Sequence, residues 1–360
     1  MEKLTLKKVI GYLAKYGIPL AIGVGLIMLL YSSFDFAQMK EIMRSGVNYW
    51  WLIGMLVVST FSHVFRAARW RLQLKALNIL PSFSALVNSI FGTYAVNLVF
   101  PRLGEVWRSG YIASRERASF TTVFGSMVGD RLSDTITVLL LTVFTFLIAQ
   151  DAFSTFLDTY PQIKDGLMGT LTSPVVWIAG IAGVVALVAL FRSKTENAIV
   201  VKVKTMVKNL WDGFAVVVKM EYKWQFLMYT VLIWGCYFTQ LYLATFAFPF
   251  TADLGMKATL VLFVLSSISM GIPTNGGLGA WHIAIIFGLS LYGIGTDFSP
   301  KGPFDAQAST FAMIVWGLQT LLLIALGIYA FIYMEIDKRL IKSGKTTIKT
   351  PITSGDGIQL

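Results

Sequence analysis

The chain has 360 residues, of which 56% are hydrophobic and 14% charged, and its formal net charge is +11. Soluble domains carry about 25% charged residues, so this composition excludes an ordinary soluble fold and indicates a protein embedded in a membrane. One cysteine and two histidines exclude a disulfide framework and argue against a His/Cys metal site. The sequence has no phosphate-binding loop, which argues against ATP-driven pumping.

Apolar runs divide the whole chain, and about 20 apolar residues suffice to cross a bilayer. Lysines precede the first run and no small-residue cleavage site follows it, so we interpret it as an uncleaved span. The predicted class is an all-α polytopic membrane protein with about seven full spans plus two re-entrant hairpins or broken helices. In chain order the runs are Tyr16–Ser33, Tyr49–Phe65, Ser84–Phe100, Thr121–Ala149, Pro174–Phe191, Gln225–Phe248, Ala258–Ile272, Leu278–Ile294 and Ala306–Met334.

Basic residues gather on one side of these runs. Five segments contain 24 of the 30 basic residues, and we expect all five on the same side of the membrane. They are the N-terminal segment, residues 66–75, 101–118 and 192–223, and the segment after Met334. By the positive-inside rule this side is the cytoplasm. We therefore expect a multi-pass protein of the inner (cytoplasmic) membrane with both termini in the cytoplasm.

The same rule indicates that two segments do not cross completely. Both flanks of Ser84–Phe100 are basic, so a hairpin that enters and returns is expected, with its break near Pro101 because proline ends a helix. Only the short turn 273–277 separates the runs Ala258–Ile272 and Leu278–Ile294, which predict a second hairpin from the opposite side. Broken backbone at membrane depth must face protein or a wet cavity.

Each half of the chain then follows the order span, span, hairpin, span. We expect an inverted repeat of residues 1–150 and 174–334, a pattern that places a transport site between the repeats. Within the second half, residues 192–224 are interpreted as a basic amphipathic helix on the inner surface, with a solvated linker helix as the alternative. The polar residues 336–360 predict a cytoplasmic tail.

Charged residues inside an apolar run are the first candidates for function, because a charge in the bilayer is costly. Asp130, Arg131 and Asp134 stand in the fourth run, and Arg131 is expected to pair with Asp134 or Asp130. The group either lines a transport site or is a structural ion pair that joins helices.

Two further groups lie at the predicted breaks. Arginine binds phosphate bidentately, so the first group would suit an anionic headgroup, or its arginines simply mark the cytoplasmic interface. The second group offers free N–H groups to an anion or forms only a tight turn, and a lone histidine is more often a packing residue than a ligand. The first comprises Asn97, Arg102, Glu105 and Arg108, and the second Asn275, Gly276, Gly277 and His282.

By contrast, the charged residues after the second run are interpreted as anchors at the membrane interface. They include Arg66 and Arg69, with Trp70 in the belt of aromatic residues that marks this interface.

These motifs together resemble the lysylphosphatidylglycerol synthase transmembrane-region family, also called flippase-like. The resemblance covers about residues 10–335. In the family an acidic residue commonly stands where this chain has His282, often with a basic residue where this chain has Trp281, so the resemblance leaves the substrate headgroup open. The matching motifs are Arg69-Trp70-Arg71, Asn97-x3-Pro101-Arg102-Leu103-Gly104-Glu105-x2-Arg108, Asp130-Arg131-Leu132-x-Asp134 and Pro273-x2-Gly276-Gly277-Leu278-Gly279.

The resemblance implies a single transmembrane domain, residues 1–335, without the family's aminoacyl-transferase domain. It implies movement of an anionic or zwitterionic phospholipid, aminoacylated or not, between leaflets, rather than an enzyme. Two alternatives remain: an intramembrane enzyme that acts on a lipid headgroup with Asp134 or Glu105 as base, and a secondary transporter of a small anion. The expected partners are a membrane phospholipid and the bilayer, with no nucleic acid, metal or cofactor. A separate lipid-modifying enzyme and a second copy of the chain remain open as partners.

Overall fold

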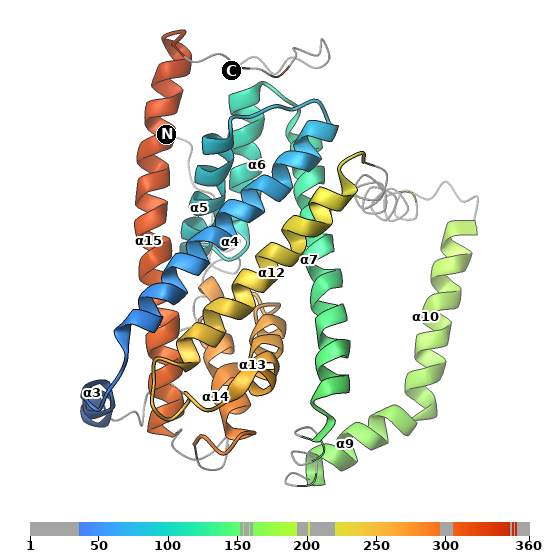
Figure 1. Cartoon of the computed structure of the whole chain (residues 1–360). Coiled ribbons are helices and arrows are strands. Elements are labelled where there is room, and N and C mark those ends of the chain that lie inside the picture. The colour runs from blue at the N-terminus through green and yellow to red at the C-terminus, as the bar shows by residue number, and fades with distance from the viewer. Residues whose placement is uncertain are drawn as a thin grey trace, which may run out of the picture.

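A computed structural model describes residues 36–151, 154, 158, 161–192, 201, 220–295, 305–345, 348 and 350, and this part is all-helical (Figure 1). The predicted first span Tyr16–Ser33 and most of the predicted amphipathic segment 192–224 lie outside the described residues. The helices are α3 (Phe36–Arg44), α4 (Tyr49–Ala76), α5 (Phe83–Val99), α6 (Leu103–Glu116), α7 (Phe120–Ile148), α9 (Pro161–Thr172), α10 (Pro174–Arg192), α12 (Lys223–Thr245), α13 (Gly255–Ser269), η2 (Asn275–Gly277), α14 (Ala280–Ser290) and α15 (Ala306–Lys342).

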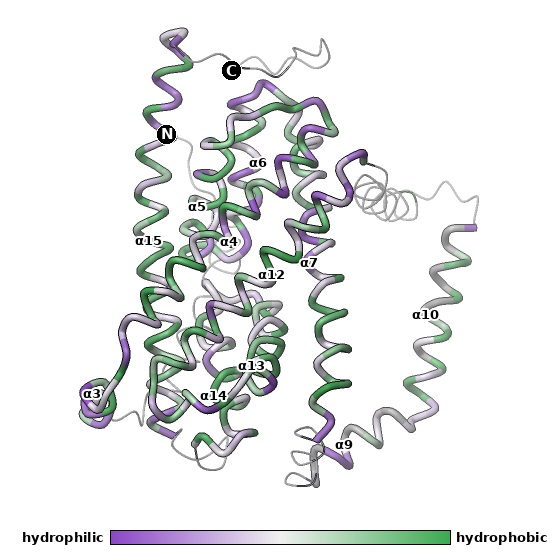
Figure 2. The backbone as a smooth tube through the Cα atoms, viewed as in Figure 1, coloured by the Kyte–Doolittle hydropathy of each residue, from purple (hydrophilic) through white to green (hydrophobic). Residues whose placement is uncertain are grey.

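Four of these helices, α4, α7, α12 and α15, are long and apolar enough to cross a membrane. A bent pair, Lys164–Thr170 with Pro174–Gly183, would be a fifth span, with 47° between its two arms. Hydrophobic residues run along the lower half of α7 and much of α15 (Figure 2). The protein is therefore a multi-pass membrane protein, although the described residues contain fewer full spans than the seven or so predicted.

Helix α4 is longer than its apolar run. It begins after Asn48, whose side chain accepts a hydrogen bond from the Trp50 backbone N–H, and it continues to Ala76. The run ended at Phe65, so the predicted connection 66–75 is the last part of a helix. The prediction failed because arginines in a buried helix face look, in sequence, like a polar connection.

Two broken helices enter the bundle from opposite ends. α5 descends from the end at which α4 finishes (the upper end in Figure 1), and α6 returns to it. Arg115, near the end of α6, donates to the Ser82 hydroxyl before α5 at 3.2 Å, so the hairpin's ends are adjacent. At the lower end, α13 and α14 flank a break in which Gly276, Gly277 and Gly279 adopt positive φ. Both breaks were predicted, but α6 lies within 101–118, which was expected to be a connection.

The tips of the two broken helices touch inside the bundle. The Asn275 side-chain amide donates to the Val99 carbonyl at 2.9 Å and to the Leu98 carbonyl at 3.2 Å. In the other direction, Arg102 Nη2 donates to the Gly271 carbonyl at 2.6 Å. Carbonyls left free where a helix stops inside the bundle thus receive donors from the opposite hairpin.

The order helix, broken pair, helix occurs twice: α4, α5–α6 and α7, and then α12, α13–α14 and α15. α4 and α12 lie side by side across the middle of the molecule (Figure 1). Below the hairpin tips, apolar side chains from both sets form the largest core cluster, which includes Met55, Leu241, Leu262 and Phe311. Above it, α4, α5, α6 and α7 enclose a group of charged side chains.

Candidate functional site

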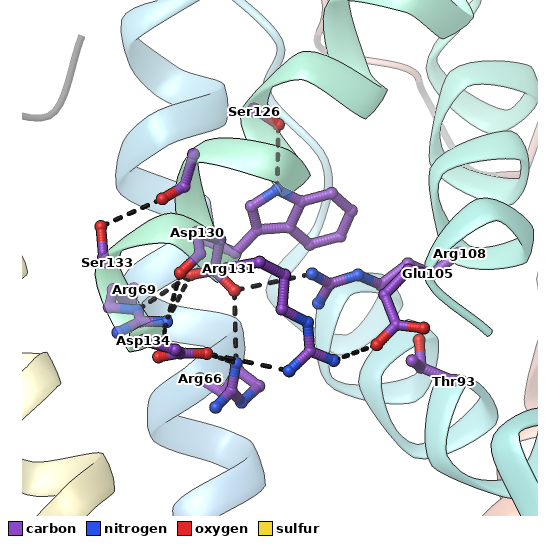
Figure 3. A network of polar contacts seen from close by, with 12 residues as sticks. Arg66, Arg69, Thr93, Glu105, Arg108, Ser126, Asp130, Arg131, Ser133 and Asp134 are labelled. Atoms are coloured by element: carbon purple, nitrogen blue, oxygen red, sulfur yellow. Dashed lines mark hydrogen bonds and ion pairs between the residues drawn. The ribbon is translucent and has the colours of Figure 1, made fainter. Parts of the chain in front are cut away.

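Two arginines of α4 meet two aspartates of α7 inside the bundle (Figure 3). Arg66 and Arg69 are three residues apart, and Asp130 and Asp134 four, so each pair shares a helix face. Arg66 Nη1 lies 2.7 Å from Asp134 Oδ2, and Arg69 Nη2 lies 2.7 Å from both Asp130 Oδ1 and Asp134 Oδ1. Both arginines are buried. The prediction that they anchor the protein at the membrane interface is therefore wrong, because they are the main partners of the two aspartates.

Arg131 turns toward the α5–α6 hairpin. Its guanidinium donates to Glu105 Oε1, while Asp134 Oδ2 lies 3.8 Å from its Nη1. Glu105 also accepts from the Asn97 amide at 3.1 Å, and the Asn97 oxygen accepts from the Gly104 backbone N–H at 2.8 Å. The predicted Arg131–Asp134 contact therefore exists, but Glu105 on α6 is the closer partner.

Of the four arginines around these carboxylates, Arg108 lies farthest from its nearest carboxylate oxygen. Its side chain is fully buried, and its Nη2 lies 3.5 Å from Asp130 Oδ2. Its guanidinium carbon lies 4.5 Å from the centre of the Trp70 ring, a cation–π arrangement. None of its three nitrogens forms a hydrogen bond with a described residue. Arg108 therefore keeps donors available for an anion.

Trp70 was predicted to lie in the aromatic belt at the membrane interface, but it packs inside the bundle against Arg108. Its side chain is fully buried, and its indole N–H donates to the Ser126 hydroxyl at 3.0 Å. The indole thereby fixes a flat apolar surface against which the Arg108 guanidinium lies.

The charges of this cluster do not balance. The buried arginine cluster, as we call it, contains three carboxylates and four guanidinium groups, which leaves one positive charge in excess. Most of these side chains are buried, but that of Arg131 is 36% exposed and offers access. The members are Arg66, Arg69, Glu105, Arg108, Asp130, Arg131 and Asp134.

Such a cluster can bind an anionic group by charge-assisted hydrogen bonds within an apolar bundle. Among the described residues, no group of three or more His, Cys, Asp or Glu side chains could hold a metal ion.

The other predicted site residues lie elsewhere. Arg102 and Asn275 belong to the contact between hairpin tips, and the Gly276 carbonyl accepts from the Trp316 indole N–H at 3.0 Å. Gly277 follows in the same turn. His282 is buried on α14, with its ring centre 5.1 Å from that of Trp316. The residues of the three predicted groups are thus divided mainly between two sites, which are the buried arginine cluster and the contact between the two hairpin tips.

Sequence reasoning missed Arg66 and Arg69, together with a tyrosine pair beside them. Arg66 Nη2 lies 3.2 Å from the Tyr237 hydroxyl on α12, which lies 3.2 Å from the Tyr94 hydroxyl on α5. One signal was available: the two arginines are at helical spacing, as are the two aspartates, and opposite charges in apolar helices need partners.

Comparison with known proteins adds a family. Residues 17–327 match the family described as lysylphosphatidylglycerol synthase TM region. This stretch contains every site residue described above. No curated protein and no solved structure matches the chain.

Proposed function

The chain belongs to the lysylphosphatidylglycerol synthase transmembrane-region family, and from this premise we propose that it moves a phospholipid with an anionic or zwitterionic headgroup between membrane leaflets. The observation that carries the proposal is the excess positive charge of the buried arginine cluster. A lipid phosphate crossing an apolar bundle needs compensation of its charge, because an unpaired charge there costs roughly 3 kcal/mol or more. Arg108 and Arg131 would supply it.

The carboxylates of the cluster extend the proposal to zwitterionic headgroups. Glu105 and Asp134 keep 13% and 12% of their side-chain surface exposed, next to the accessible Arg131. An ammonium or hydroxyl of the headgroup could therefore donate to a carboxylate while the phosphate accepts from an arginine. We assign these carboxylates a binding role rather than a catalytic one, since each is held by an arginine. A separate enzyme would supply any aminoacylated lipid.

The first test removes the Arg108 charge. The protein is reconstituted into liposomes that contain a fluorescent phosphatidylglycerol, and dithionite reports how fast the label leaves the outer leaflet. A hydrogen bond to a charged group is worth roughly 1.5–3 kcal/mol, so we expect Arg108→Gln to slow translocation about tenfold or more.

The control is the same substitution at an exposed arginine. Arg339 forms a surface ion pair with Glu335 at 3.0 Å, far from the cluster, and Arg339→Gln should translocate like the wild type. Both variants must elute as the wild type does on size exclusion. A folded Arg108→Gln variant with the wild-type rate would remove Arg108 from the proposed site, and a wild-type rate equal to that of protein-free liposomes would refute translocation.

A further inference from the structure

Arg102 stands at the tip of the α5–α6 hairpin and is exposed there. The 17 residues of α5 rise about 1.5 Å each, so the tip lies ~25 Å along the helix from its first residue. If α5 starts at the membrane surface, as the basic residues before it predict, a tip at this distance lies within the apolar layer of the bilayer, which is about 30 Å thick. Among the described residues, Arg102 bonds to the Gly271 carbonyl but forms no ion pair with a carboxylate. An exposed guanidinium at this depth favours an anionic partner.

Beside this arginine the surface is hollowed between α5, η2 and α15. The hollow, which we call the lateral groove, has a volume of about 380 Å³ and a mostly apolar lining. Val99, Ile324 and Ile328 in that lining are 61%, 43% and 56% exposed. Exposed apolar side chains favour contact with lipid over water, so we expect the groove to open sideways toward the bilayer.

The groove and the arginine are parts of one surface. Val99 lines the groove and precedes Arg102 by three residues, and the Asn275 amide that bonds to the Val99 carbonyl lines the groove as well. Asn275 Oδ1 is buried and forms no hydrogen bond with a described residue. A hydroxyl at the polar end of a ligand could donate to this oxygen. Arg102 itself does not line the groove but follows its lining residue Val99 by three positions. An apolar hollow with a cation this close in the chain complements an amphiphile that has an anionic head.

We propose that the lateral groove holds an acyl chain of an anionic phospholipid whose phosphate lies against Arg102. This inference rests on the proposed function and deepens it, since it adds a membrane-facing station at which the lipid enters before its headgroup reaches the buried arginine cluster. A free small anion would contact Arg102 and leave the groove empty, which distinguishes a lipid from an inorganic ion.

Photolabelling tests the station without requiring transport. The protein is placed in phosphatidylcholine vesicles that contain phosphatidylglycerol with a diazirine in one acyl chain, and mass spectrometry locates the labelled peptides. Contact with bulk lipid is measured on the exposed α7 residues Leu139 and Leu140 as an internal reference. We expect the α15 peptide that contains Ile324 and Ile328 to be labelled more strongly than this reference.

Substitutions separate the head from the chain. Arg102→Gln should lower the groove-to-reference ratio about tenfold for the phosphatidylglycerol probe, and should not change it for a diacylglycerol probe that has the same chain and no phosphate. Ile324→Trp, which fills the groove, should lower labelling of Ile328 several-fold by steric exclusion. Leu321→Trp is the matched control, because Leu321 is 63% exposed on α15 and does not line the groove.

Two outcomes would overturn the inference. One is an unchanged ratio for phosphatidylglycerol in Arg102→Gln, and the other is equal groove labelling by diacylglycerol, which would mean an apolar surface without recognition of the anion. Photolabelling measures lipid binding and not transport, so a failure of the groove proposal can be told apart from a failure of the translocase proposal. Loss of transport in Arg108→Gln with unselective groove labelling would refute the station alone.

Discussion

Asp134 is a carboxylate of α7 that contacts both buried arginines of α4. Its two oxygens lie 2.7 Å from Arg66 and from Arg69, and Arg131 lies 3.8 Å away. Removing one partner of a buried ion pair costs about 3–5 kcal/mol, because the remaining charge loses its compensation. We expect Asp134→Leu to lower stability by that amount, seen as an earlier thermal unfolding transition of the detergent-solubilised protein.

The partner substitution provides the control. Arg66→Met added to Asp134→Leu removes one charge of each sign, while Arg69 keeps Asp130 and Arg131 keeps Glu105. A matched apolar pair can replace a buried ion pair at little cost, so the double variant should regain most of the lost stability. If it were no more stable than Asp134→Leu alone, the Arg66–Asp134 contact would not be what the single change disrupts.

The charged residues of α7 could be identified as site residues from the sequence, but their partners on α4 could not. Asp130, Arg131 and Asp134 stand out because their neighbours are apolar. Arg66 and Arg69 do not, since several other basic residues follow closely and imitate a cytoplasmic connection. The pairing of residues more than 60 positions apart depends on how α4 and α7 pack, which the spacing within one helix does not determine.

Gly104 allows the two arms of the first hairpin to approach one another. A Cβ at Gly104 would collide with the Thr93 backbone carbonyl and would lie 2.8 Å from Asn97 Oδ1. The carbonyl cannot rotate away, and the Gly104 N–H bond to Asn97 would be disturbed as well. Gly104→Ala should therefore destabilise the fold and misplace Glu105, with a lower unfolding temperature and slower lipid movement.

Gly110 on the same helix is the matched control. A Cβ there meets nothing within 4 Å, and alanine is favoured over glycine in a helix by up to about 1 kcal/mol. Gly110→Ala should leave the unfolding temperature unchanged or raise it. Equal behaviour of the two variants would contradict the close approach of α5 and α6.

Element boundaries were predictable where backbone chemistry sets them. Pro101 and the glycines after Pro273 marked both breaks, because proline ends a helix and glycine adopts positive φ. The α6 arm was not predicted, since its charged residues lower its hydropathy and its buried face cannot be recognised without its neighbours. The same reason explains why α4 was ended too early.

For the whole molecule, charged contacts hold the upper end together. The Arg115 guanidinium on α6 lies 2.7 Å from Asp337 on α15, and it also contacts Glu116. Lys75 at the end of α4 donates to the Tyr222 hydroxyl before α12 at 2.7 Å. The charge bias between the two ends was predictable from sequence, whereas these contacts depend on how α6 lies against α15 and α4 against α12.

The orientation of the bundle is the last prediction. Four arginines counted toward the basic side lie inside the bundle or at the hairpin tip, namely Arg66, Arg69, Arg102 and Arg108. Among the described residues, basic side chains still gather at the upper end, where α4, α6 and α15 finish (Figure 1); they include Lys75, Arg115, Arg117, Lys338 and Lys342. By the positive-inside rule we expect that end to face the cytoplasm.

In a Cys236→Ala background, single cysteines at exposed upper positions Ala76, Ser114 and Ser343 should not react with an impermeant thiol reagent in intact cells. A cysteine at Ser154, on the lower end, should react. After the cells are opened, all four must react, which verifies exposure. Labelling of Ser343→Cys from outside would reverse the orientation, and labelling of Ala76→Cys and Ser114→Cys from opposite sides would show that the segment between them crosses the membrane completely.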